Sequence, residues 1–184
     1  MNQKKSGSYY TRALTTTALM IALSLILDQI KIFHLPQGGS ITLFGKLPIV
    51  VLGYLLGARW GVAGGAVTGL LNLVTGGYVV HPVQLVLDYV LAFAVMGLSG
   101  LVRDKKNGLT LGYLIAMLGR YICAVLSGWI FFGEYAPENF SALTWSLWYN
   151  LSYIGAEGVL TLIVISIPPV KNMFVKAREQ LLNG

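Results

Sequence analysis

Residues 83–101 read VQLVLDYVLAFAVMGLSGL, an apolar run that carries one charged side chain, Asp88. A helix rises about 1.5 Å per residue, so this run is long enough to cross the roughly 30 Å hydrocarbon layer of a bilayer. The composition of the whole chain agrees, because 55% of its residues are hydrophobic and 11% are charged. The sequence therefore predicts an all-α membrane protein.

Five further apolar stretches flank this run, each bounded by Gly, Pro or charged residues. Together they predict six transmembrane helices, at about 13–30, 43–56, 60–74, 83–101, 111–132 and 143–167. The second and third are the shortest and richest in glycine, so we expect them to be irregular and covered by neighbouring protein. The predicted domains are an N-terminal tail (1–12), a single six-helix transmembrane domain (13–170) and a C-terminal tail (171–184).

The positions of the cations predict the orientation, because Lys and Arg near membrane helices are retained on the cytoplasmic side. Most cations fall on one side of a six-helix arrangement: Lys4, Lys5, Arg12, Arg59, Arg103, Lys105, Lys106, Lys171, Lys176 and Arg178. Lys31 and Lys46 fall on the other side, in the first external loop. We therefore expect both tails to be cytoplasmic, and we attribute the net charge of +6 to topology rather than to nucleic-acid binding.

Three charged side chains lie inside the apolar segments, where they are costly and mark candidate functional sites: Asp88, Arg120 and Glu157. Counting from the external loops places Arg120 and Glu157 at a similar depth of roughly 20 Å, which makes them a candidate ion pair. Asp88 lies nearer the outer face, roughly 10 Å deep, and would then have no partner. A carboxylate there favours a cation that arrives from outside.

Polar and aromatic side chains share helix faces near this depth. Gln84 lies one turn before Asp88, and Tyr89 is adjacent. The last segment carries rings and hydrogen-bonding groups at helical spacing: Trp145, Ser146, Tyr149, Asn150 and Tyr153. Each aromatic residue alone is also typical of a membrane interface. Taken with Asp88, they predict an outward-facing pocket, since ring faces attract cations.

The first helix has small residues one turn apart, Ala18 and Ala22, which allow another helix to approach closely in a membrane. They serve either internal packing or the docking of a partner protein. The chain has no GxxxxGK[ST] motif for ATP hydrolysis. It also lacks a nucleophile–base pair and a cluster of metal ligands, so we predict no enzyme activity, no catalytic residue, no metal and no cofactor.

Besides a protein that only binds a cationic solute, two classes of function can be considered from the residues alone. A self-sufficient secondary transporter would use Arg120 and Glu157 as a proton relay, although the chain has no recognisable internal repeat. A membrane enzyme acting on a lipid would use Asp88 with the same two residues for acid–base chemistry and anion binding, but no nucleophile–base pair or metal cluster accompanies them, which disfavours it.

Four ordered stretches resemble a known family: PQGGS (36–40), HPVQLVLDY (81–89), the run from RY (120–121) through SG (127–128) to FFGEYAP (131–137), and WSLWYN (145–150). In these the chain resembles the thiamine-binding S-components of energy-coupling factor (ECF) importers, the membrane subunits that capture a vitamin. The resemblance covers almost the whole chain after the N-terminal tail.

The resemblance implies a six-helix protein of the bacterial cell membrane with thiamine as its ligand. Its partners would be an ECF transmembrane coupling subunit and two ATPase subunits, which alone use ATP. Ala18 and Ala22 match the docking motif of the family. With Gln84 added from its helix position, the predicted substrate-binding residues are Tyr78, Gln84, Asp88, Tyr89, Arg120, Gly128, Phe132, Trp145, Ser146 and Asn150.

The chain departs from the family pattern at Ala124, where relatives often have histidine, and at Asp88, where some have glutamate. The acid exchange keeps the charge and shortens the side chain. Losing an imidazole removes one wall of the pocket, so a thiamine precursor, an analogue or another cationic vitamin stays open as the ligand.

Overall fold

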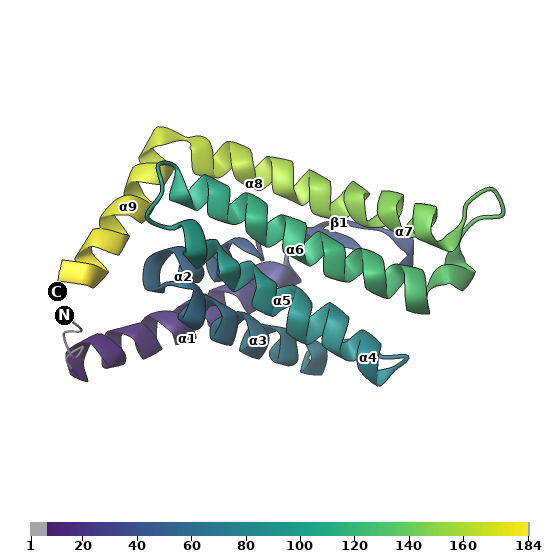
Figure 1. Cartoon of the computed structure of the whole chain (residues 1–184), viewed down its shortest axis with the longest axis horizontal. Coiled ribbons are helices and arrows are strands. Elements are labelled where there is room, and N and C mark those ends of the chain that lie inside the picture. Colours follow the sequence, from purple (N-terminus) through teal and green to yellow (C-terminus); the bar gives the residue numbers. More distant parts are fainter. Residues whose placement is uncertain (1–6, 184) are drawn as a thin grey trace.

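The chain forms an elongated bundle in which most helices run along the long axis (Figure 1). The computed structural model describes residues 7–183, and their side chains as far as Leu181. Both ends of the described chain lie at the same end of the bundle, where the last helix folds back across it (Figure 1).

All six apolar segments are helical. The first three helices are α1 (Gly7–Gln29), α2 (Leu47–Leu56) and α3 (Ala58–Val74). The fourth segment is one continuous helix of mixed type: α4 (Pro82–Leu85), the π-helical η2 (Val86–Leu91), α5 (Ala92–Ala94) and the 3-10-helical η3 (Val95–Val102). The fifth is α6 (Gly108–Phe131), and the sixth comprises α7 (Ala142–Asn150), the π-helical η5 (Leu151–Gly155) and α8 (Ala156–Ser166).

In the described part of the chain, four helices are long and apolar enough to cross a membrane: Gly7–Gln29, Pro82–Val102, Gly108–Phe131 and Ala142–Ser166. The second helix, α2, begins four residues later than expected, because Phe44 adopts a positive φ of 58° in the turn before it. Its ten residues span only about 15 Å. Every residue of α2 from Pro48 to Leu56 is buried, so it is covered by neighbouring protein as its composition predicted.

Two of the loops between the expected helices contain regular secondary structure. The first external loop is an antiparallel hairpin of β1 (Lys31–His34) and β2 (Ser40–Thr42), joined by the short helix η1 (Pro36–Gly38). Another short helix, η4 (Gly133–Tyr135), follows α6.

The segment expected as a C-terminal tail is part of a helix, α9 (Pro168–Asn183). Proline is well tolerated at a helix start, since the first N–H groups have no partner in the helix. Phe174, Ala177 and Leu181 pack against the hydrophobic core, and Arg178 pairs with Asp104. Residues 1–6 of the expected N-terminal tail lie outside the described residues, and α1 already begins at Gly7.

Glycines on α3 bring it into direct contact with the helix that carries Asp88. A Cβ atom at Gly65 would lie 2.3 Å from the carbonyl oxygen of Phe93, and one at Gly69 would lie 2.0 Å from that of Tyr89. Both distances are shorter than van der Waals contact. The two helices therefore pack backbone to backbone, which fixes the depth and rotation of the Asp88 segment.

We expect Gly65→Ala to lower the free energy of unfolding by about 1–3 kcal/mol, because the new methyl group forces the two helices apart. Gly158→Ala on α8 is the matched control, since its Cβ would meet nothing within 4 Å. Alanine favours a helix over glycine by about 1 kcal/mol, so the control should be neutral or stabilising. Melting temperatures in detergent test this; equal shifts in both variants would contradict it.

Candidate functional site

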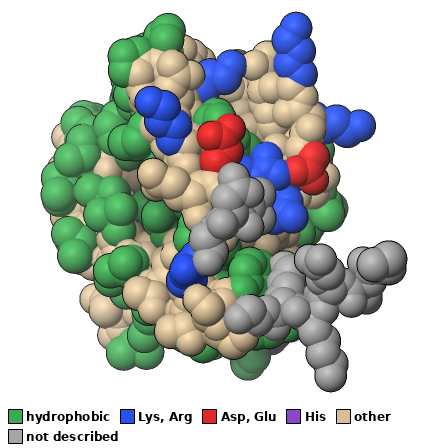
Figure 2. All heavy atoms as spheres, turned by 90° about the vertical axis from the view of Figure 1, so that its left-hand side faces the viewer, with side chains coloured by type: hydrophobic (Ala, Val, Ile, Leu, Met, Phe, Trp, Pro, Cys, Tyr) green, Lys and Arg blue, Asp and Glu red, His purple; other side chains and the backbone are tan. Residues whose placement is uncertain are grey.

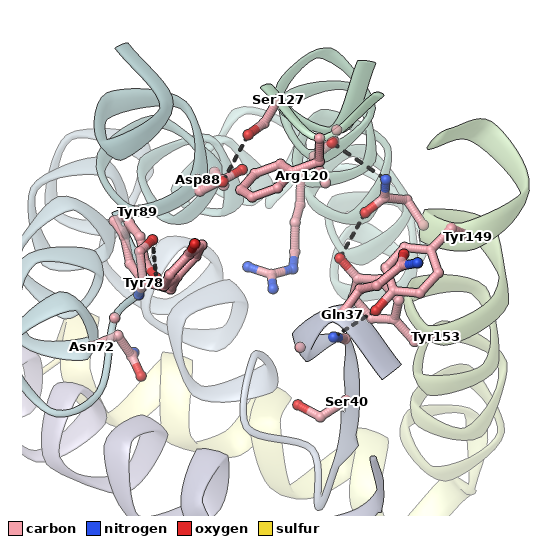
Figure 3. Close-up of a pocket in the computed structure, with 18 of the residues that line it drawn as sticks. Gln37, Ser40, Asn72, Tyr78, Asp88, Tyr89, Arg120, Ser127, Tyr149 and Tyr153 are labelled. Carbon is pink, nitrogen blue, oxygen red and sulfur yellow. Dashed lines mark hydrogen bonds between the residues drawn. The ribbon is translucent and has the colours of Figure 1, made fainter. Parts of the chain in front are cut away.

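A cavity of about 710 Å³ opens between the hairpin, the end of α3, η2, α6 and α7. Its walls include all ten residues that the sequence predicted for substrate binding: Tyr78, Gln84, Asp88, Tyr89, Arg120, Gly128, Phe132, Trp145, Ser146 and Asn150. They come from four separate segments of the chain and surround one space (Figure 3). Their roles toward a ligand remain predictions.

Asp88 is held by two uncharged donors. Its Oδ2 accepts a hydrogen bond from Gln84 Nε2 at 2.7 Å and another from Ser127 Oγ at 2.7 Å (Figure 3). Within residues 7–183, no Lys, Arg or His nitrogen lies within salt-bridge distance of it. The carboxylate is therefore oriented but its charge is not neutralised, which suits a cationic ligand.

The helix around Asp88 is not α-helical. Asp88 and Tyr89 lie in the π-helical turn η2, and Tyr153 lies in the other π-helical turn, η5. Such turns occur frequently at functional sites, because they re-aim the side chains that follow. Both turns border the cavity.

Aromatic rings make up much of the remaining wall. The rings of Trp145 and Tyr149 have centroids 5.9 Å apart, and those of Tyr149 and Tyr153 are 5.7 Å apart. On the opposite side, the ring centroids of Tyr78 and Phe132 are 6.5 Å apart. Ring faces on two sides of one cavity fit an aromatic or cationic guest.

Arg120 and Glu157 do not form the expected ion pair. The carboxylate of Glu157 accepts hydrogen bonds from Thr42, which the return strand of the hairpin brings to it. Arg120 instead lies 5.0 Å from the centre of the Phe93 ring, and its Nη1 is buried without a hydrogen-bond partner among the described residues. Its guanidinium points into the middle of the cavity (Figure 3).

The structure contains a buried ion pair that the sequence analysis missed. Lys46, expected in the exposed first loop, is 7% exposed and pairs with Asp28, which is also 7% exposed. Both side chains line the cavity floor. The sequence did contain a signal for this pair, because segment 13–30 carries one acid near its end and the next helix, 43–56, carries one base near its start.

Gly128 allows α6 and α7 to meet closely. A Cβ there would lie 2.3 Å from Ser146 Oγ, which donates a hydrogen bond to the Val125 carbonyl at 2.9 Å. Asn150 Nδ2 donates to the same Ser146 Oγ at 3.1 Å, and Asn150 Oδ1 accepts from Tyr153 at 2.7 Å. The polar groups of α7 and η5 are thus locked together before any ligand enters.

The turn of the hairpin rests on α7. The Tyr149 hydroxyl donates to the Pro36 carbonyl and accepts from the Gly39 N–H at 2.8 Å. Trp145 Nε1 donates to Gln37 Oε1 at 3.3 Å, and Gln37 has a positive φ of 68°. The hairpin therefore forms one wall of the cavity.

A bundle of membrane-length helices around one cavity, with an unneutralised carboxylate and aromatic walls, defines a membrane protein that holds a small solute. The family model of thiamine transporter proteins matches residues 14–176. The chain belongs to the thiamine transporter protein family.

Individual relatives agree with this family. The chain is 34% identical over 183 residues to the thiamine transporter ThiT of Bacillus subtilis, covering 91% of this chain and 93% of that protein. It is 30% identical over 169 residues to ThiT of Lacticaseibacillus paracasei, covering 82% and 83%. The solved structure of ThiT from Listeria monocytogenes has the same fold, with a TM-score of 0.75 at 23% identity over 90% of this chain and 98% of that one.

These findings confirm the resemblance to thiamine-binding S-components. With the four membrane-length helices, they make the chain a multi-pass protein of the bacterial plasma membrane. The family is one of transporters rather than enzymes.

Tyr149→Phe should release the turn of the hairpin, because it removes both the donor to Pro36 and the acceptor for the Gly39 N–H. Each such bond contributes about 1 kcal/mol, so the loss of both should raise amide exchange in residues 37–39 by up to about 30-fold. Hydrogen–deuterium exchange followed by mass spectrometry measures it. In the control Tyr153→Phe, whose hydroxyl bonds Asn150 instead, this peptide should exchange as in the wild type.

Proposed function

We propose that this protein captures thiamine from outside the cell and delivers it to an ATP-driven ECF coupling module for import. The observation that carries the proposal is Asp88, a carboxylate at membrane depth that two neutral side chains orient and no cation neutralises among the described residues. The thiazolium ring of thiamine is a cation that fits this position, and the relatives named thiamine transporters support it as the ligand.

We further propose that all six apolar segments cross the membrane as one domain, with α2 enclosed by its neighbours and both tails cytoplasmic. Support comes from the end of the molecule at which both described chain ends lie (Figure 2). Lys and Arg side chains collect there, with acidic side chains among them (Figure 2). An excess of Lys and Arg is typical of the cytoplasmic side.

The energy for import would come from partner subunits, because the sequence has no ATP-binding motif. Ala18 and Ala22 are exposed on α1, so they are available to a coupling subunit rather than used in packing within this chain. On this proposal the protein itself has no catalytic residue and uses no cofactor.

Thiamine binding to the detergent-purified protein, followed by quenching of its tryptophan fluorescence, tests the ligand and the role of Asp88. We expect tight binding by the wild type and a loss of about 100-fold or more in Asp88→Asn, because a buried counter-charge is removed while the side-chain shape is kept.

Glu138→Gln is the matched control, since it removes one exposed acid from the loop after α6 without touching the cavity. It should bind as the wild type does. A wild type that binds no thiamine would refute the ligand and direct attention to precursors and other cationic vitamins. Equal binding by Asp88→Asn would refute the counter-charge.

A bulky residue on the docking face separates capture from transport. Ala18→Trp should bind thiamine normally but lose uptake in vesicles that also contain the coupling subunit and ATPases, because close approach of the partner helix is blocked. The control Val159→Trp, at a position 58% exposed on α8, should retain both activities. Uptake by vesicles containing this protein alone would instead favour a self-sufficient transporter.

A further inference from the structure

Glu157 is a buried acid that the proposed ligand contacts do not use. Its side chain is 5% exposed, and it does not line the cavity. Among the described residues no cation lies within salt-bridge distance of it. A charged group at membrane depth is costly and calls for a functional reason.

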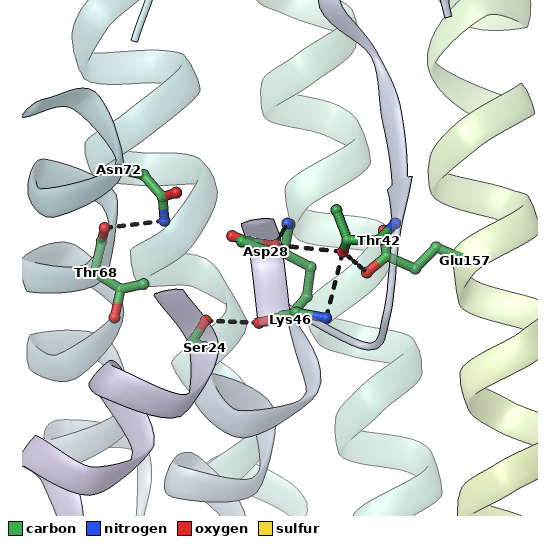
Figure 4. Close-up of polar contacts among 8 residues, drawn as sticks. Ser24, Asp28, Thr42, Lys46, Thr68, Asn72 and Glu157 are labelled. Atoms are coloured by element: carbon green, nitrogen blue, oxygen red, sulfur yellow. Dashed lines mark hydrogen bonds and ion pairs between the residues drawn. The ribbon is translucent and has the colours of Figure 1, made fainter. Parts of the chain in front are cut away.

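The carboxylate of Glu157 contacts one residue at two points. The backbone N–H of Thr42 donates to Oε2 at 3.3 Å, and the Thr42 hydroxyl lies 2.9 Å from Oε1 (Figure 4). The same hydroxyl is 3.3 Å from Asp28 Oδ1, so its single proton is better placed for Glu157. Two bonds to one residue fix both the position and the direction of its backbone.

Thr42 is the last residue of β2 and lies opposite Lys31, so it forms the base of the hairpin. The turn at the other end begins three residues away, about 10 Å along an extended strand. There Gln37 and Gly39 meet α7 through contacts that depend on accurate placement, with donor–acceptor distances of 2.8–3.3 Å. A small rotation at the base is enough to separate them.

The other side of this base is held independently of Glu157. Ser24 Oγ donates to the Gly45 carbonyl at 2.6 Å, and Lys46 pairs with Asp28 (Figure 4). Among the described residues no cation lies within salt-bridge distance of Glu157, so its removal takes a carboxylate partner from none of them. A mutation of Glu157 should therefore change the placement of the hairpin without unfolding the protein.

We infer that Glu157 is a positioning residue for the ligand site. Through Thr42 it sets the angle of the hairpin, and thereby the contact of Gln37 and Gly39 with Trp145 and Tyr149. The inference rests on the proposed function, because the cavity beside the hairpin is taken as the thiamine site. It makes this acid a determinant of how long the ligand is retained rather than a group that touches the ligand.

The test measures hairpin position and ligand release separately. Spin labels at Ile32, which is 58% exposed, and at the exposed Glu138 report the hairpin relative to the loop after α6, in a Cys123→Ala background. In the ligand-free protein, Glu157→Ala should broaden or shift the distance distribution. In the unlabelled protein, the same change should speed thiamine dissociation about tenfold or more.

Glu157→Gln is the rescue variant, because its amide oxygen still accepts from the Thr42 N–H and its NH₂ reaches the hydroxyl. It should keep the wild-type distance distribution and an off-rate within about threefold of the wild type. If Glu157→Gln changed the distance distribution and the thiamine off-rate as much as Glu157→Ala, the charge itself would matter, and the positioning role would be overturned. A wild-type distribution and off-rate in Glu157→Ala would overturn it as well.

Thr42→Val provides a second route if Glu157→Ala fails to fold. Its matched control is Thr68→Val, another fully buried hydroxyl, which bonds the Gly64 carbonyl within its own helix. The inference requires Thr42→Val to move the hairpin and speed release while Thr68→Val does neither; equal behaviour overturns it. If the wild type binds no thiamine, the proposed function fails, and the spin-label distances still decide the role of Glu157.

Discussion

Backbone N–H and C=O groups at membrane depth have no water to bond, and this constraint governs the arrangement of the bundle. Helix α2 is too short to cross a bilayer, so the protein around it must complete the crossing. It lies among α1, α3, η3 and α6, and almost all of it is buried. The glycines of α3 serve the same end, because they let backbones pack closely where long side chains would hold them apart. The cavity exists in the space that this tightly packed half leaves toward α7.

The helical segments were predictable from hydropathy, since each apolar run between Gly, Pro and charged residues became a helix. The hairpin was not predicted, because its strands are short and its placement depends on α7 and α8, which lie more than a hundred residues away. The helix α9 was missed because Pro168 and Pro169 marked a stop. The same residues also suit a helix start, and only the packing of Phe174 onto the core decides between the two readings.

The cavity wall was predictable to a greater extent than the charge pairing. Residues on one helix face must point the same way, so Gln84 and Asp88, or Ser146 and Asn150, could be grouped from spacing alone. The depth of a residue along a helix, however, does not say in which direction around the helix axis its side chain points. Arg120 and Glu157 lie on different helices at a similar estimated depth, yet one meets Phe93 and the other Thr42. Pairing between helices is a property of tertiary packing, and a single sequence does not contain it.

The two π-helical turns have an evolutionary consequence. A π turn holds one more residue than an α turn, so it is what an α-helix becomes when a single residue is inserted without disturbing its ends. Each residue turns an α-helix by about 100°, so the same insertion without a π turn would rotate one end of the helix relative to the other. In η2 and η5 the extra residue is accommodated within the turn, and three residues of these turns line the cavity: Asp88, Tyr89 and Tyr153. Gain or loss of one codon in these turns would change which side chains face the cavity while the rest of each helix kept its packing.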